Sequence, residues 1–65
     1  QKQIMEDMIS RLKPEYAEVI TLRYMNHYAY EEIANELNIP LGTVKTRLHR
    51  AKVYLAQIIE QESKK

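Results

Sequence analysis

Residues 41–55 read Leu-Gly-Thr-Val-Lys-Thr-Arg-Leu-His-Arg-Ala-Lys-Val-Tyr-Leu and carry a clear helical pattern. Apolar residues recur at steps of four, three and four positions, which places them on one side of an α-helix. These residues are Val44, Leu48, Ala51 and Leu55. At about 100° per residue, the opposite side carries Thr46, His49 and Val53, flanked by Lys45 and Arg50. The segment therefore predicts a helix with an apolar stripe facing a core and a polar outer face.

The outer face of this predicted helix is rich in positive charge. No acidic residue occurs between Glu36 and Glu60, and five side chains in the segment can be cationic. They are Lys45, Arg47, His49, Arg50 and Lys52. A helix that is apolar on one side and basic on the other has the shape and charge to enter the major groove of DNA. The same pattern also fits a solvent-exposed amphipathic helix whose cations only keep it soluble, so the segment alone leaves both interpretations open.

The size and composition of the chain restrict its class. Its 65 residues fit one small domain, whose core alone contributes about 3–5 kcal/mol. It contains no cysteine, which excludes disulfides, zinc–thiolate sites and thiol catalysis and fits a reducing compartment. No apolar run reaches the length of a membrane span, and no signal peptide is visible. Because helical periodicity is already present next to Gln1, we expect the C-terminal module of a longer protein.

The net charge of +1 hides an uneven distribution along the chain. Residues 1–40 hold four lysines and arginines against seven acidic residues, a net charge of −3. Residues 41–65 hold six against two, a net charge of +4. A domain with one acidic half and one basic half can present different faces to different partners.

The first half of the chain predicts two helices separated by a proline. Apolar residues spaced by three and four positions predict a helix over about 2–12. Pro14 ends this helix, because the residue before a proline is driven out of the helical conformation. Proline also suits the first turn of a second helix, which we expect over about 14–25. Tyr16 and Tyr24 are expected to be half-buried core residues of that helix.

The second half predicts two helices that meet in a tight turn. A third helix is expected over about 30–37, and Asn38 and Pro40 end it, since asparagine tolerates the left-handed conformation and proline cannot continue a helix. A fourth helix is expected over about 41–61, with a frayed tail behind it. The chain is therefore expected to be an all-α, four-helix domain. The short connection makes residues 30–55 a C-terminal helix-turn-helix.

Three segments carry a resemblance to a known family. They are Leu22-Arg23-Tyr24, Tyr30-Glu31-Glu32-Ile33-Ala34 and Ile39-Pro40-Leu41-Gly42-Thr43-Val44-Lys45-Thr46-Arg47-Leu48-His49-Arg50-Ala51-Lys52. Over about Leu12 to Leu55, the chain resembles region 4 of bacterial sigma factors, most closely the extracytoplasmic-function group. The resemblance implies a cytoplasmic module that binds double-stranded promoter DNA at the minus-35 element with its last helix. It also implies docking on the β flap of RNA polymerase and, in this group, frequent capture by an anti-sigma factor.

The resemblance also assigns roles to residues. The candidates to face the bases are Lys45, Thr46, His49 and Arg50. Arg23 matches an arginine that the family uses on the DNA, and it is expected to contact phosphate. Gly42 and Thr43 open the last helix, where free N–H groups and the helix dipole suit a phosphate. Arg47 and Lys52 project sideways, which suits backbone phosphates better than bases.

The chain departs from the family pattern at the entry to the third helix. Relatives usually have a Gly-Leu-Ser run where this chain has His27-Tyr28-Ala29. Ala29 has no hydroxyl group to cap the helix, at a cost of about 1 kcal/mol.

Other functions stay open at the level of sequence. The DNA-binding domain of a two-component response regulator has a similar four-helix unit with a Gly-Thr-Val-Lys segment, and a helical module could bind protein only. An apolar face on the first helix is expected to dock protein partners; it is formed by Ile4, Met5, Met8 and Ile9. His27 and His49 are far apart and have no acidic or cysteine residues to complete a ligand set, so we expect no bound metal. No other pattern in the sequence indicates a cofactor site or a catalytic site, so we expect no cofactor and no enzyme activity.

Overall fold

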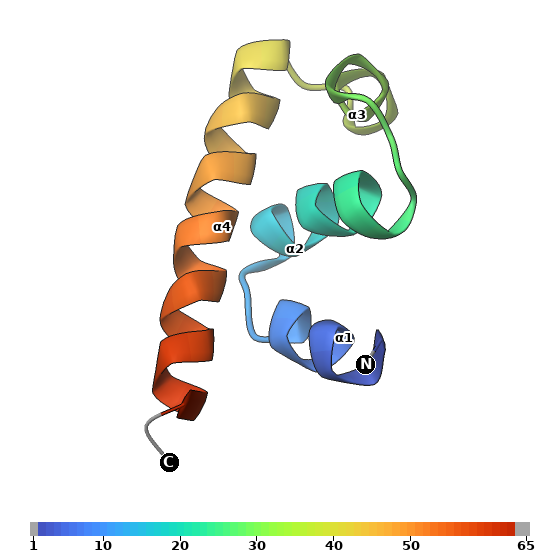
Figure 1. The fold of residues 1–65 in the computed structure, drawn as a ribbon. Coiled ribbons are helices and arrows are strands. Elements are labelled where there is room, and N and C mark those ends of the chain that lie inside the picture. The colour runs from blue at the N-terminus through green and yellow to red at the C-terminus, as the bar shows by residue number, and fades with distance from the viewer. Residues whose placement is uncertain (1, 64–65) are drawn as a thin grey trace.

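A computed structural model describes the backbone of residues 2–63 and the side chains of residues 6–62. Its elements are α1 (Lys2–Ser10), α2 (Pro14–Ile20), the π-helical turn η1 (Thr21–Met25), α3 (Tyr30–Leu37) and α4 (Leu41–Ser63). All of these elements are helical, which confirms the expected all-α fold (Figure 1). The long α4 runs along one side of the molecule, and the shorter helices stack beside it, with α1 near its C-terminal end and α3 near its N-terminal end.

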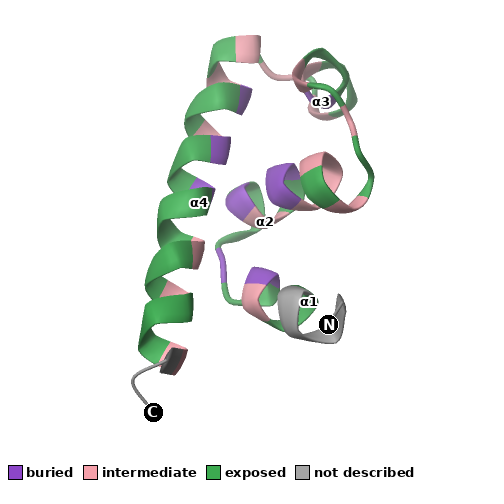
Figure 2. Cartoon of the chain, in the orientation of Figure 1, coloured by how far each residue is buried: buried purple, intermediate pink, exposed green. Residues whose placement is uncertain are grey.

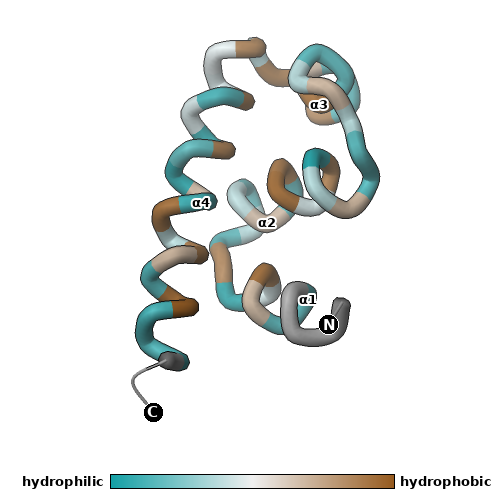
Figure 3. The backbone as a smooth tube through the Cα atoms, in the orientation of Figure 1, coloured by the Kyte–Doolittle hydropathy of each residue, from teal (hydrophilic) through white to brown (hydrophobic). Residues whose placement is uncertain are grey.

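The core lies mainly between α2 and α4, and α1 and α3 add to it at either end (Figure 2). The largest fully buried side chains are Val19, Ile20, Ile33, Val44 and Leu48. Figure 3 shows hydrophobic positions of α4 turned toward the shorter helices, as the apolar spacing predicts. Ala51 is also fully buried, and its small side chain suits a close approach of α4 to its neighbours.

The second helix ends in a wider turn than the sequence predicts. Asn26 donates its N–H to the Thr21 carbonyl oxygen at 3.1 Å, five residues back instead of four. Tyr28 then donates its N–H to the Leu22 carbonyl oxygen at 2.9 Å, which reverses the chain toward α3. Residues 14–25 are helical throughout, as expected. The sequence does not predict the change from hydrogen bonds four residues back to hydrogen bonds five residues back. One wide turn contains too few apolar residues to change their visible spacing.

His27 takes the left-handed conformation in the connection that follows, with a φ of 62°. This conformation costs an L-residue about 1–2 kcal/mol, whereas glycine adopts it readily. His27 stands where the family pattern has the glycine of its Gly-Leu-Ser run. The departure noted in the sequence therefore affects the backbone of the connection as well as the cap of α3.

Only one of the two hydrogen bonds of a capping box forms at the start of α3. Ala29 donates its N–H to Glu32 Oε1 at 2.7 Å, so the carboxylate half of a capping box is formed. The methyl group of Ala29 offers no acceptor for the N–H groups of the first turn. Glu32 thus compensates in part for the serine that this position lacks.

We expect Ala29→Ser to raise the free energy of unfolding by about 1 kcal/mol, because the hydroxyl would complete the capping box with Glu32. Urea denaturation followed by circular dichroism measures the change. Ala56→Ser, at an exposed position inside α4, is the matched control and is expected to bring no gain. A serine at position 29 that adds no stability would mean that the Glu32 bond alone satisfies this helix end.

The C-terminal ends of α1 and α4 each differ by two residues from the expected bounds. α1 ends at Ser10 instead of 12, because the N–H groups of Arg11 and Leu12 bond three residues back and Lys13 is extended before Pro14. α4 reaches Ser63 instead of 61.

Arg11 ties α1 to the last turns of α4. Its Nη1 donates to Glu62 Oε2 at 2.7 Å, and its Nη2 donates to Asp7 Oδ2 at 3.1 Å. The hydrogen bond with Glu62, followed by the charge of Glu62, raises the pKa of Arg11.

The side chains of the first two helices differ from some expectations. Tyr16 is buried, with 9% of its surface exposed, but the expectation for Tyr24 was wrong, since η1 leaves its ring 48% exposed. Ile4 and Met5 lie outside the described side chains. Of the rest of the predicted docking face, Ile9 belongs to the core and Met8 is half-buried. Within residues 2–63, no helix combines the length and apolar character needed to cross a membrane.

Candidate nucleic-acid interface

The first half of α4 exposes four polar side chains on the side away from the core. We call them the outer strip: Lys45, Thr46, His49 and Arg50. Behind them, three residues of α4 have at most 2% of their surface exposed (Figure 2). These are Val44, Leu48 and Ala51. The structure thus separates an anchoring side of α4 from a side that is free to meet a ligand.

The turn before α4 fixes how the outer strip is presented. Asn38 is left-handed, with a φ of 57°, and Ile39 donates its N–H to the Ala34 carbonyl oxygen at 3.0 Å. These contacts close the end of α3. The Pro40 carbonyl oxygen then accepts the N–H of Val44 at 3.1 Å, which starts α4. Because α3 packs against α4 directly after this short turn, it supports the helix and leaves the outer strip uncovered.

Gly42 lies in the first turn of α4, and the domain itself gives no steric reason for a glycine there. A Cβ atom placed on Gly42 would meet no atom within 4 Å, and its φ is not positive. Glycine in a helix costs about 1 kcal/mol relative to alanine. The absence of a side chain is useful if another molecule approaches the helix backbone closely, as a phosphate does at the start of a helix.

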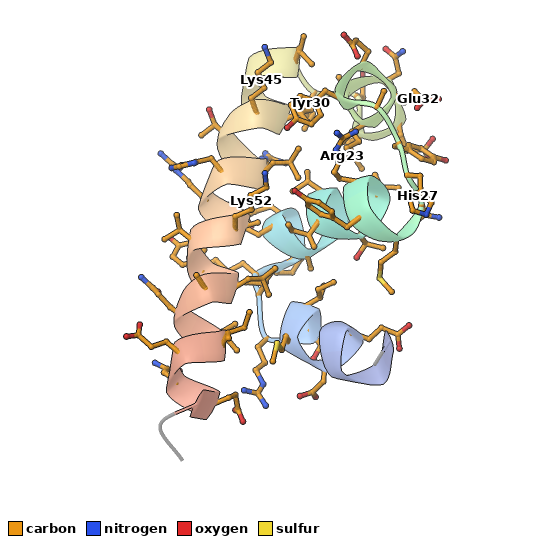
Figure 4. The ribbon with its side chains drawn as sticks, in the orientation of Figure 1. Arg23, His27, Tyr30, Glu32, Lys45 and Lys52 are labelled. Carbon is orange, nitrogen blue, oxygen red and sulfur yellow. The ribbon has the colours of Figure 1, made fainter. Side chains whose placement is uncertain are left out.

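Arg23 and Lys45 line one depression, which lies between η1, α3 and α4. Arg23 Nη1 donates to the Tyr28 carbonyl oxygen at 2.9 Å, and the guanidinium carbon lies 4.8 Å from the centre of the Tyr30 ring (Figure 4). These contacts hold the connection between η1 and α3 and use only part of the five donors of the arginine. Arg23 therefore has a structural role that the sequence did not predict, and it keeps donors for a phosphate.

Lys52 lies seven residues after Lys45, two helical turns further along the same side of α4. Its Nζ is 5.7 Å from the centre of the Tyr24 ring. The hydrogen bond with the Tyr24 side chain, followed by the charge of that side chain, raises the pKa of Lys52. The ammonium group is therefore fully charged at neutral pH and is held toward η1.

A second depression lies on the other side of the outer strip. It is lined by Glu15, Tyr16, Pro40, Gly42, Thr43, Thr46, Arg47 and Arg50. The structure thus brings together three of the expected phosphate contacts, from positions 42, 43 and 47. Glu15 of α2 was not expected here, and its negative charge disfavours a phosphate close to α2. The side of this depression formed by α4 is therefore electrostatically more favourable to an anion than the side formed by α2.

Glu31 of α3 lines the depression of Arg23 and Lys45, and sequence reasoning did not place it there. It also missed Tyr24 and Glu15 as neighbours of the basic residues. Both belong to the second helical segment, far in sequence from α4, and no spacing pattern indicates that they approach it. His27 lies in the connection between η1 and α3, away from α4 (Figure 4). Among the described residues, no group of histidines and carboxylates is arranged to hold a metal ion.

Comparisons with known proteins agree with this geometry. Residues 2–55 match the family described as Sigma-70, region 4. The ECF RNA polymerase sigma factor SigW of Bacillus subtilis is 45% identical over 47 residues, which cover 72% of this chain and 25% of that protein. The ECF RNA polymerase sigma-E factor of Haemophilus influenzae is 34% identical over 59 residues, which cover 91% of this chain and 31% of that protein. The RNA polymerase sigma factor HrpL of Pseudomonas syringae pv. syringae is 55% identical over 31 residues, which cover 48% of this chain and 17% of that protein. The chain thus spans less than a third of the length of these relatives.

Proposed function

Because this chain belongs to the Sigma-70, region 4 family, we propose that it is the promoter-binding module of a sigma factor. In this proposal α4 enters the major groove at the minus-35 element, and the outer strip contacts the edges of the bases. One observation carries it: the buried stripe of α4 anchors the helix, while the outer strip is exposed between two depressions that contain cations. The module acts by binding alone and performs no chemical step.

Contacts to phosphates would set the register of α4 in the groove. A helix in the major groove has one phosphate backbone on each side, and cations flank the outer strip on both sides. Gly42, Thr43 and Arg47 would serve one backbone, and Arg23 and Lys52 the other. These contacts carry no sequence information, so the base specificity is assigned to the outer strip.

Titration of the domain with a duplex that carries a minus-35 element, at several salt concentrations, tests the proposal. With about four phosphates neutralised, log K is expected to fall with log salt at a slope of about −3 to −4. The affinity of a single module is expected to be modest, since such modules bury only about 600–1,000 Å². Absence of binding even at low salt would reject the proposal and favour a module that binds protein only.

We expect Gly42→Ala to raise the free energy of unfolding by about 0.5–1 kcal/mol and to weaken DNA binding. Alanine favours the helix and meets no neighbour inside the domain, but its methyl group stands where a phosphate would approach. Thermal unfolding and fluorescence anisotropy with labelled duplex measure the two effects. A variant that is more stable and binds equally well would place the DNA backbone away from this turn.

A separate groove formed by α2, η1 and α3 is assigned to RNA polymerase. It is lined by Pro14, Ala17, Glu18, Thr21, Leu22, Glu36 and Leu37, none of which belongs to the two basic depressions. An apolar floor with an acidic rim suits a partner helix with an apolar stripe and basic flanks. We assign this groove to the β flap, and an anti-sigma factor would compete for it. The pair Glu18→Lys and Glu36→Lys should weaken binding of a β-flap fragment and leave DNA affinity unreduced.

The place of this chain in a larger protein is also part of the proposal. Since it spans at most 31% of the relatives named above, we assign it to a longer, cytoplasmic sigma factor as its region 4 module. The family match over residues 2–55 favours this assignment over the DNA-binding domain of a two-component response regulator.

A further inference from the structure

We infer that Tyr24 and Lys52 form an additional contact to the DNA backbone, in which Tyr24 positions Lys52 and its own hydroxyl group also reaches the phosphate. The inference rests on the proposed function, in which Lys52 and the η1 residue Arg23 already contact phosphate, and it adds Tyr24, which has no DNA role so far. The ligand is a phosphate of the duplex beside α4, on the η1 side.

The first support is the way the two side chains meet. Tyr24 comes from η1 and Lys52 from α4, and Nζ of Lys52 lies 5.7 Å from the ring centre. Both side chains are nevertheless exposed, and Tyr24 keeps 48% of its surface accessible. An exposed aromatic ring on a small domain marks a surface that a partner can use, and here the ring bears a hydroxyl group beside a cation.

The second support is the charge of the surroundings. The groups that shift the pKa of Lys52 are Tyr24, Tyr30 and Arg23, and no carboxylate is among them. An ammonium group has three donors, and its position 5.7 Å from the centre of the Tyr24 ring leaves donors available to another acceptor. Lys52 thus lies beside the ring of Tyr24 and carries the positive charge that a lysine has at neutral pH.

The third support is the position of the pair along α4. Lys52 is two turns, about 10 Å, from Lys45 on the same side of the helix. Lys45 shares its depression with Arg23, the residue directly before Tyr24. The pair therefore extends the basic side of the proposed interface along the axis of α4. Lysine, arginine and tyrosine side chains are common ligands of backbone phosphates.

Equilibrium binding of a labelled duplex of random sequence at low salt tests the inference, because a phosphate contact does not depend on base sequence. Lys52→Ala is expected to weaken binding about tenfold and to reduce the log–log salt slope by about 1. Tyr24→Phe keeps the ring and removes the hydroxyl, and it should weaken binding about threefold with no change of slope. When Tyr24→Phe is combined with Lys52→Ala, it should lower the affinity less than it does alone, because Tyr24 acts partly through Lys52.

Lys13→Ala is the matched control, since it removes an exposed lysine between α1 and α2. Its affinity and slope should equal those of the unsubstituted domain. Circular dichroism and melting temperature are expected to be the same for all variants, so changes in binding report the contact.

An unchanged slope in Lys52→Ala, or a Tyr24→Phe affinity equal to that of Lys13→Ala, would overturn the inference. Loss of β-flap binding with intact DNA binding would also overturn it and assign the pair to a protein contact. These results differ from failure of the proposed function, in which the unsubstituted domain itself would not bind duplex DNA.

Discussion

Leu48→Ala is expected to lower the free energy of unfolding by about 2–5 kcal/mol. Leu48 has 2% of its surface exposed and belongs to the same buried cluster as Val19 and Ile20 of α2. Truncation removes buried methyl groups and leaves a cavity, which helices packed from both sides cannot close completely. A core that contributes about 3–5 kcal/mol cannot absorb such a loss, so much of the variant is expected to be unfolded at 25 °C.

Urea denaturation and the far-ultraviolet circular dichroism signal measure this effect. Val53→Ala, a truncation on the exposed side of the same helix, is the control and should change stability by at most about 0.5 kcal/mol. A Leu48→Ala variant with the melting temperature of the unsubstituted domain would contradict the packing of α4. In that event the apolar stripe would not be what holds the outer strip toward solvent.

The helix-turn-helix was the most predictable part of the fold, because two strong signals coincide there. The apolar spacing of α4 extends over several turns, so its phase is well determined. Asn38 and Pro40 then determine the end of α3, since asparagine accepts the left-handed conformation and proline cannot continue the helix. The same phase predicted which residues of the outer strip would be exposed.

The features that the sequence did not predict depend on tertiary contacts or on single backbone angles. The wide turn at η1 changes the direction of Tyr24 and Arg23 without altering the apolar pattern around them. His27 is left-handed, and although histidine takes this conformation more often than most residues, it does so too rarely for its presence alone to predict it. Glu15 reaches the second depression only because α2 packs against α4. The position of Glu15 depends on a distant segment, and the η1 turn and His27 depend on single backbone angles; local periodicity reports neither.

Arg50→Ala and Lys45→Ala are each expected to weaken binding of a minus-35 duplex by about 10- to 100-fold, the cost of about 1–3 kcal/mol for a lost base contact. Both side chains are exposed on the outer strip, and they line different depressions on its two sides. Neither lies in the core, so the variants should keep the circular dichroism signal and melting temperature of the unsubstituted domain.

The comparison of two duplexes separates base contacts from phosphate contacts in these variants. A duplex selected by the unsubstituted domain from a random pool carries the preferred bases, and an unselected duplex carries only the backbone. Loss of a base contact lowers the affinity for the selected duplex more, and so reduces the ratio between the two. Loss of a phosphate contact lowers both affinities alike and reduces the salt slope by about 1.

Lys13→Ala shows the effect of removing one positive charge outside the outer strip and the two depressions beside it, and it should leave both the affinities and their ratio unchanged. If Arg50→Ala or Lys45→Ala leaves the ratio unchanged while the affinity falls, that residue belongs with Arg47 among the backbone contacts. Thr46 and His49 would then be the remaining base-facing residues, because they lie nearest the middle of the exposed side of α4. If neither variant binds more weakly than Lys13→Ala, the outer strip is not the surface that meets DNA.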